Sequence, residues 1–310
     1  MSPLISVSMT CYNSATTLPM ALASLLAQTY QNWECVFVDD GSTDSPEGLV
    51  KGAKDGRIRY HRLDRNVGRG AASQFALEKS KGDFIAILDA DDWYYPGKLE
   101  RQIEALRRED AVALLSAGMA IVDTRNRLVG VRGFSGDDKI TFGPMAKLAQ
   151  APFAFGPCML RRTVALKAGF DESFRCGQDA DFLLRVVLDN SYCILPEVMY
   201  VYTEYRSARL RKILATHHNV RRMFWKHRGR FPVASSMRIG ESLLKSSAYS
   251  VGFACGQRVR VLNRRSRPPT EPERLEFQKA QAAVLATARR VFGSNAVGES
   301  AEAWGGSATP

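Results

Sequence analysis

The chain has 310 residues, of which 45% are hydrophobic and 24% charged, and its formal net charge at pH 7 is +11. This apolar content excludes a disordered chain, and 24 glycines with 13 prolines exclude a collagen-like one. No apolar run approaches the ~18 residues of a membrane-spanning helix, and the N-terminal residues lack the basic region that opens a secretory signal. The six cysteines stand singly, without a CxxC pair, which is typical of reduced core residues. These features predict a cytoplasmic globular protein.

Short β-rich runs alternate with helical patterns through the first part of the chain. Strands are expected at 4–10, 33–39, 57–63 and 84–88. Helices are expected at 17–28, 69–80 and 96–108. This alternation predicts an α/β fold with a Rossmann-like, mostly parallel sheet flanked by helices.

The pattern is looser in the second part of the chain. Further elements are expected as strands at 112–122, 157–161 and 191–201 and as a helix at 179–188. No element is assigned to the polar, glycine-containing residues 124–150. A basic amphipathic helix is expected at 207–226, followed by helices at 236–254 and 271–291. The chain is therefore divided into an α/β domain at 1–206, a basic helical appendage at 207–292 and a disordered tail at 293–310.

The positive charge is concentrated near the C-terminal end of the chain. Residues 205–268 contain 16 Lys or Arg and a single acidic residue, Glu241, whereas the rest of the chain contains 27 basic and 31 acidic residues. Two interpretations of this basic segment remain open. It either docks on an anionic membrane surface, or it packs its apolar face on the rest of the protein and leaves its arginines solvated.

Polar residues follow four of the predicted strands, at the point where each strand ends. These clusters are Thr10–Asn13, Asp39–Asp44, Asp64–Gly68 and Asp89–Asp92. The carboxyl ends of parallel strands meet at one edge of a sheet, and ligands of such folds bind there. We therefore expect the four clusters to converge on one ligand site.

The cluster Asp89-Ala90-Asp91-Asp92 places three carboxylates within four residues. Their mutual repulsion costs stability unless something compensates it. A divalent cation would do so, because carboxylate oxygens suit Mg²⁺ or Mn²⁺, and these ions also bridge to substrate phosphates. The alternative is a solvated acidic turn at the end of a strand.

Three further motifs carry candidate ligand contacts. In Asp39–Asp44 a carboxylate can accept hydrogen bonds from a base or a ribose, whereas a simple capping turn would explain Ser42 and Asp44 but not the adjacent pair of aspartates. The basic, glycine-containing residues 65–70 open a helix and suit a phosphate or a base. Asp179 stands in the first turn of a helix, where backbone amides stabilise a carboxylate, and an ordinary N-cap is the alternative.

Five motifs occur in an order that resembles family 2 glycosyltransferases of the GT-A fold, of the bacterial surface-polysaccharide type. They are Thr10-Cys11-Tyr12-Asn13, Asp39-Asp40-Gly41-Ser42-Thr43-Asp44, Arg65-Asn66-Val67-Gly68, Asp89-Ala90-Asp91-Asp92 and Gly177-Gln178-Asp179. The resemblance covers residues 4–206. It implies an inverting enzyme that moves a sugar from a nucleoside diphosphate sugar, with UDP as the expected nucleotide, to a hydroxyl of a glycan or polyprenyl-linked acceptor.

The resemblance also implies a role for each motif. The nucleotide-binding residues would be Thr10, Tyr12, Asn13, Asp40, Arg65, Gly68 and Asp89, all within residues 1–110. Asp91 would bind Mn²⁺ or Mg²⁺, and Asp179 would be the general base that deprotonates the acceptor. Asp92 and Gln178 would contact the acceptor or the donor sugar, and residues 111–206 would form the acceptor-binding part.

Two positions depart from the family pattern. Family members usually carry Glu where this chain has Gln178, which removes one charge beside the expected base. A histidine that often follows the last strand is absent from Tyr202-Thr203-Glu204-Tyr205-Arg206. Arg206 or Arg209 is therefore the candidate for contacting the diphosphate.

Two rival functions remain. A nucleotide-sugar-binding protein without activity would be expected to have lost its base, yet Asp179 is present. A nucleic-acid- or anionic-surface-binding protein would act through residues 205–268 without transferase activity, which leaves the convergent carboxylates unexplained. The enzyme is preferred, with a sugar nucleotide, a glycan acceptor and an anionic membrane surface as partners and no nucleic acid. It is expected in the cytoplasm or on the cytoplasmic face of the inner membrane.

Overall fold

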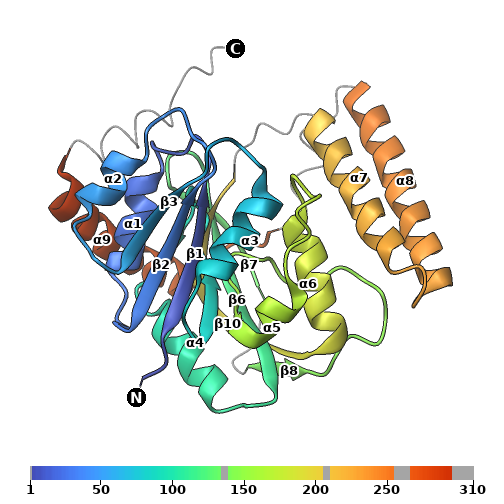
Figure 1. Ribbon diagram of the computed structural model, residues 1–310, viewed down its shortest axis with the longest axis horizontal. Helices are drawn as coiled ribbons and strands as arrows, with labels where there is room; N and C mark the ends of the chain where they lie inside the picture. Colours follow the sequence, from blue (N-terminus) through green and yellow to red (C-terminus); the bar gives the residue numbers. More distant parts are fainter. Residues whose placement is uncertain (1, 134–138, 205–209, 255–265, 295–310) are drawn as a thin grey trace.

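The computed structural model describes residues 2–133, 139–204, 210–254 and 266–294. A twisted sheet runs through the main body of the molecule with helices packed on both of its faces, and a pair of helices stands to one side (Figure 1).

The N-terminal half of the sheet is parallel. Its strands are β1 (Ile5–Cys11), β2 (Trp33–Asp39), β3 (Ile58–Arg62) and β4 (Phe84–Ile87), in the spatial order β3-β2-β1-β4. The connecting helices are α1 (Leu18–Leu26), α2 (Glu47–Gly52) and α3 (Arg69–Lys79). Strands β2 and β4 are buried along their whole length, which explains why their sequences are nearly continuous apolar runs.

The C-terminal half mixes parallel and antiparallel pairing. Its long strands β6 (Val112–Val122) and β10 (Ser191–Thr203) are parallel, and the short β9 (Met159–Arg161) lies antiparallel between β4 and β6. Further antiparallel pairs come from β5 (Trp93–Tyr94), β7 (Leu128–Arg132) and β8 (Ile140–Phe142). The helices here are α4 (Lys98–Arg107), α5 (Arg162–Ala168) and α6 (Gln178–Asp189). The longest ladders are parallel, so the predicted Rossmann-like, mostly parallel sheet with flanking helices is confirmed.

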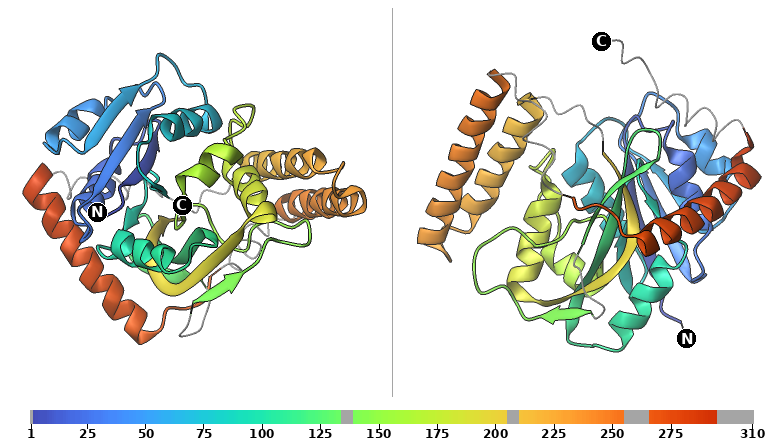
Figure 2. Two further views of the ribbon diagram at one scale, coloured as in Figure 1. Left: turned by 60° about the horizontal axis from the view of Figure 1, so that its bottom comes forward. Right: turned by 180° about the vertical axis from the view of Figure 1, so that it is seen from behind.

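The helices of the predicted appendage at 207–292 lie in two places. α7 (Leu210–Lys226) and α8 (Pro232–Ala254) pair as a hairpin that projects from the body beside α6 (Figure 2). α9 (Glu271–Phe292) instead lies along α1, where its buried Phe277 and Val284 join Trp93 in one apolar cluster. Within the described ranges, no helix is both long and apolar enough to cross a membrane.

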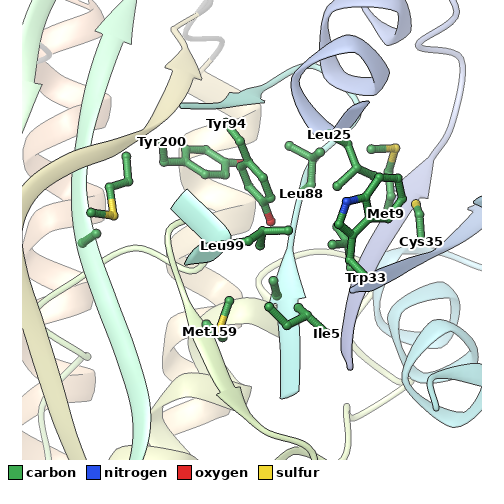
Figure 3. Close-up of a cluster of buried hydrophobic side chains, with 14 of the residues drawn as sticks. Ile5, Met9, Leu25, Trp33, Cys35, Leu88, Tyr94, Leu99, Met159 and Tyr200 are labelled. Carbon is green, nitrogen blue, oxygen red and sulfur yellow. The ribbon is translucent and has the colours of Figure 1, made fainter. Parts of the chain in front are cut away.

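The main core lies between the first strands, α1 and α4 (Figure 3). Trp33, Tyr94 and Tyr200 are among its largest fully buried side chains. Four of the cysteines are buried, namely Cys11, Cys35, Cys158 and Cys193. The prediction that the cysteines are core residues is wrong for Cys176, which is exposed, and Cys255 lies outside the described residues.

Lys98 is a basic side chain that is fully buried in this core. Its Nζ donates a 2.7 Å hydrogen bond to Oε1 of Gln102 and lies 4.1 Å from the centre of the Tyr94 ring. Burial lowers the pKa of Lys98 from 10.5 to about 7. Between these two values the unfolded chain binds a proton that the folded chain does not. The contribution of Lys98 to stability therefore rises with pH through this window.

We expect Lys98→Met to remove this pH dependence. The free energy of unfolding of the variant should exceed that of wild type by most at pH 7 and below, where the folded wild-type protein has to hold a buried ammonium group. Towards about pH 10 its advantage in the free energy of unfolding should shrink by about 1–3 kcal/mol. Urea unfolding across this range measures the difference. A difference between variant and wild type that stays constant with pH would contradict the prediction.

Candidate active site

Two of the predicted clusters meet beyond the ends of β1 and β2. The two strands pair so that Cys11 lies opposite Asp39, and the loops that follow are bonded to each other. The backbone amide of Asn13 donates to Oγ of Ser42 over 3.0 Å, and Oδ1 of Asn13 accepts from the amide of Thr43 over 2.8 Å. Asn13 therefore joins the two loops, and its side-chain oxygen faces the second loop.

Asp40 attaches a third cluster at the same place. Its Oδ1 accepts a 2.7 Å hydrogen bond from the amide of Val67, and its Oδ2 accepts a 3.1 Å bond from the amide of Gly68. Gly68 has a φ of +95°, and a Cβ atom there would lie 3.2 Å from Cα of Arg175, so the position requires glycine. The buried Asp40 thus fixes the loop that presents the exposed side chain of Arg65.

Asp39 organises the same loops from inside the protein. Its carboxylate is fully buried and accepts hydrogen bonds from the Tyr60 hydroxyl and from Arg62, each at 2.7 Å, and from the Ser42 amide at 2.8 Å. Burial alone would raise the pKa of Asp39, but the hydrogen bonds from Ser42 and Tyr60 and the charge of Arg62 lower it on balance. The adjacent aspartates therefore shape the loops more than an ordinary capping turn would.

Asp89 and Asp91 form an acidic centre that Asp179 approaches from another element. Asp89 is exposed to solvent, yet protein surrounds it on most sides. Desolvation and the charges of Asp91 and Asp179 raise its pKa to about 7, against the opposing charge of Arg69. Asp89 therefore interacts electrostatically with both the expected metal ligand and the expected base, which are far apart in the chain.

Asp92 faces the protein interior. It is 2% exposed, its Oδ2 accepts a 2.6 Å hydrogen bond from the Tyr200 hydroxyl, and its Oδ1 accepts a 3.0 Å bond from the amide of Thr203. Burial and the charges of Asp91 and Asp89 raise the pKa of Asp92 well above its usual value. The predicted contact with the acceptor or the donor sugar is therefore corrected. Asp92 connects the acidic turn to β10.

Gln178 and Asp179 stand in the first turn of α6, after Gly177 in the left-handed conformation. The preceding segment is held against α3, where the amide of Gly70 donates to the carbonyl of Phe174 over 3.2 Å. Asp179 is half-buried. Gln178 is 8% exposed, and no partner for its Oε1 is found among the described residues. A buried amide oxygen of this kind suits a hydrogen-bond donor on a ligand.

Helix α7 supports the segment that carries Asp179, which the sequence did not indicate. Asp181 is fully buried, and its carboxylate pairs with Arg185 of α6 and with Lys226 of α7, both at 2.9 Å. Nδ2 of Asn219 in α7 donates to the carbonyl of Cys176 over 2.9 Å. Part of the charge of the basic helix is therefore used to hold α6.

The remaining predicted contacts differ in exposure. Thr10 is half-buried near the end of β1, and Tyr12 is 49% exposed, so its ring is open to a ligand. Arg206 and Arg209, the predicted contacts of a diphosphate, lie outside the described residues.

Tyr202 and Arg132 are two side chains near the acidic centre that the sequence did not indicate. Burial and the charges of Asp92 and Asp91 raise the pKa of Tyr202 to about 12. The Arg132 guanidinium lies 5.8 Å from the centre of the Tyr202 ring and lines a cavity of about 720 Å³ beside residues 151–154. Arg132 comes from β7, within the segment to which no element had been assigned.

Residues 6–170, more than half of the chain, match the family model described as Glycosyl transferase family 2. The chain belongs to this family. Succinoglycan biosynthesis protein ExoO of Rhizobium meliloti is 30% identical over 238 residues, which cover 70% of this chain and 65% of that protein. The Escherichia coli beta-1,3-glucosyltransferase WfgD is 33% identical over 144 residues, 46% of this chain and 55% of that protein. This family 2 chain therefore spans less than two thirds of the length of either relative.

Solved structures share the fold of this family 2 protein. S. aureus TarS 1-349 in complex with UDP matches 97% of this chain and 88% of its own, with a TM-score of 0.61 and 18% identity. The mannosyltransferase PcManGT from Pyrobaculum calidifontis, in complex with GDP-Man and Mn²⁺, matches 94% of this chain and 88% of its own, with a TM-score of 0.57 and 16% identity. These likenesses agree with the GT-A fold that the motifs implied.

The acidic centre suits a cation that a nucleotide helps to bind. Within the described residues, no group of three His, Cys, Asp or Glu side chains could hold a metal ion by itself. Mg²⁺ and similar ions are commonly bound through one or two carboxylates together with substrate phosphates. Asp91 supplies such a carboxylate, so the residues present fit Mn²⁺ or Mg²⁺ bound together with a diphosphate.

Proposed function

We propose that this family 2 member transfers a sugar from a nucleoside diphosphate sugar, with UDP as the expected nucleotide, to a hydroxyl of a glycan or polyprenyl-linked glycan in cell-surface polysaccharide biosynthesis. The observation that supports the proposal is that the charges of Asp91 and Asp179 both raise the pKa of Asp89, so a candidate metal ligand and a candidate base each interact electrostatically with it. The relatives support it. The name of WfgD gives a UDP-Glc donor and a diphosphoundecaprenol acceptor, and TarS was crystallised with UDP and UDP-GlcNAc.

In this proposal the nucleoside lies across the loops that follow β1, β2 and β3. Thr10 and the exposed ring of Tyr12 contact the base, and Asp40, whose oxygens also hold the amides of Val67 and Gly68, lies at its polar edge. Arg65 and Gly68 close the pocket, since Asp40 already holds the amide of Gly68. Asn13 contributes by joining the first two loops.

The reaction is a single in-line displacement at the anomeric carbon, which inverts its configuration. The acceptor oxygen bonds to this carbon while the bond from the carbon to the diphosphate oxygen breaks, and the acceptor proton passes to the carboxylate of Asp179. Asp91 would hold Mn²⁺ or Mg²⁺, which would supply charge stabilisation for the departing diphosphate. Asp181, fixed by Lys226 and Arg185, holds the turn that orients Asp179.

Calorimetric titration of the full chain with UDP, GDP and dTDP, each with and without Mn²⁺, tests the proposal. We expect one nucleotide to bind more tightly than the others and to bind best when Mn²⁺ is present. Failure of all three to bind under both conditions would overturn the proposal. It would favour a protein that acts only through its basic segment.

The same proposal places the enzyme as a peripheral protein on the cytoplasmic face of the inner membrane. A polyprenyl-linked acceptor stays in the bilayer, so the enzyme has to come to it. The basic residues of 205–268 are attracted to anionic lipid headgroups.

A further inference from the structure

Helix α8 packs on α7 through one face only. The packed face carries Ser242 and Ser246, which are bonded to α7 through the carbonyl of His217 at 3.2 Å and through Arg221 at 3.1 Å. Tyr249 continues this face, with its ring centre 5.5 Å from that of His217. The spacing of three or four residues between these side chains places them on one side of the helix.

The opposite side of α8 carries a line of exposed aliphatic side chains. They are Val233, Met237, Leu244 and Val251, which are 71%, 64%, 74% and 62% exposed. Successive members are four or seven residues apart, so they stand one above another along the helix, and we call them the α8 stripe. Helix α8 forms the outer side of the hairpin in Figure 1 and in the right-hand view of Figure 2. An apolar line of this length on a surface marks an interaction site.

The apolar face of α7 is used differently. Its Met223 and Phe224 are buried in a cluster with Phe174 and Leu184, so α7 packs on the body of the protein. Packing on the rest of the protein, one of the two interpretations of the basic segment, therefore applies to α7. Helix α8 keeps an apolar face toward solvent, so membrane docking, the other interpretation, stays open for it.

Charge decides which partner fits the α8 stripe. Residues 210–254 contain nine Lys or Arg and one acidic residue, so a second copy of this hairpin would bring like charge against like charge. A nucleic acid would match the charge but would gain nothing from four aliphatic side chains. An anionic lipid surface matches both, because its acyl region takes the apolar side chains and its headgroups attract the basic ones.

We propose that the α8 stripe inserts into the interface of an anionic membrane and is the docking surface of this protein. On the same hairpin, Lys245 is exposed on α8, and Trp225 of α7 is 57% exposed with the Arg228 guanidinium 4.5 Å from its ring centre. Trp and basic side chains of this kind are typical of the level of lipid headgroups. The inference deepens the peripheral association proposed above and does not depend on the identity of the sugar.

The hairpin that carries the α8 stripe is also in contact with the helix of the candidate base. α7 lies between α8 and α6, and it holds the turn of Asp179 through Lys226 and Asn219.

Flotation with liposomes tests the proposal on the full chain. The probe is a vesicle of phosphatidylglycerol and phosphatidylcholine in equal parts, compared with phosphatidylcholine alone. We expect wild type to float with the anionic vesicles at low salt and to be released by high salt. Leu244→Asn combined with Val251→Asn should lower the partition coefficient by about tenfold or more. Leu275→Asn is the matched control, because Leu275 is 51% exposed on α9, away from the hairpin.

Each outcome of this experiment has a defined meaning. Equal flotation of wild type and the double variant, or no flotation of wild type, would overturn the docking surface. A wild-type dimer in sedimentation that the double variant loses would also overturn it, in favour of a second copy. Melting temperature and UDP titration of the double variant should match wild type. This keeps a loss of docking distinct from misfolding and from failure of the proposed transferase function.

Discussion

Asp179→Asn is expected to lower the rate of sugar transfer by about 10²–10⁴-fold, while the affinity for UDP in the presence of Mn²⁺ stays close to that of wild type. Asparagine keeps the shape of the side chain in the first turn of α6 but has no carboxylate to accept the acceptor proton. Because Asp179 lies in α6 and not in the loops proposed to hold the nucleoside, its loss should affect the chemical step more than nucleotide binding. UDP release during transfer and calorimetric titration with UDP separate the two quantities.

Asp189→Asn is the matched control for this variant. Asp189 is the last residue of the same helix, its side chain is 58% exposed, and it pairs with Arg230 at 2.6 Å. The control should transfer sugar at the wild-type rate. Undiminished activity of D179N would exclude Asp179 as the base. A loss of UDP affinity as large as the loss of rate would instead indicate that Asp179 acts on the nucleotide site.

The N-terminal half of the fold was predictable because its strands carry their own signal. Residues 33–39 and 84–87 are apolar on both faces, as central parallel strands are, and polar residues mark the end of each. From this the convergence of the loops after β1, β2 and β3 followed, and the bonds of Asn13 and Asp40 confirm it. Local pattern and topology agree here, so sequence reasoning was sufficient.

The features that the sequence did not predict are the ones that depend on contacts between residues far apart in the chain. β7 and β8 are short strands whose pairing depends on β6 and β10, so residues 124–150 carry no periodic pattern of their own. The sequence grouped α9 with the basic helices by position, whereas Phe277 and Val284 pack it near α1. The sequence does not distinguish Asp92 from Asp89 and Asp91, because the Tyr200 hydroxyl that binds Asp92 comes from a strand far along the chain.

Asp91→Ala is expected to remove the Mn²⁺-dependent part of UDP binding, so that the dissociation constant for UDP with Mn²⁺ rises about tenfold or more. It should also leave the ligand-free protein at least as stable as wild type. The charge of Asp91 raises the pKa of both Asp89 and Asp92, which means that the three carboxylates repel one another in the folded state. Removing one charge relieves this repulsion. Calorimetry with and without Mn²⁺ and thermal unfolding without ligand measure the two effects.

The two effects of Asp91→Ala together distinguish a ligand site from a structural turn. Removing a carboxylate that stabilises the fold lowers the stability of the protein. Removing a carboxylate that is held for a cation instead raises the stability of the cation-free protein. Asp110→Ala is the control, since Asp110 is 98% exposed and should change neither quantity. If D91A lowered the melting temperature and kept the Mn²⁺ dependence of UDP binding, the acidic turn would be structural, and the cation would have to bind elsewhere.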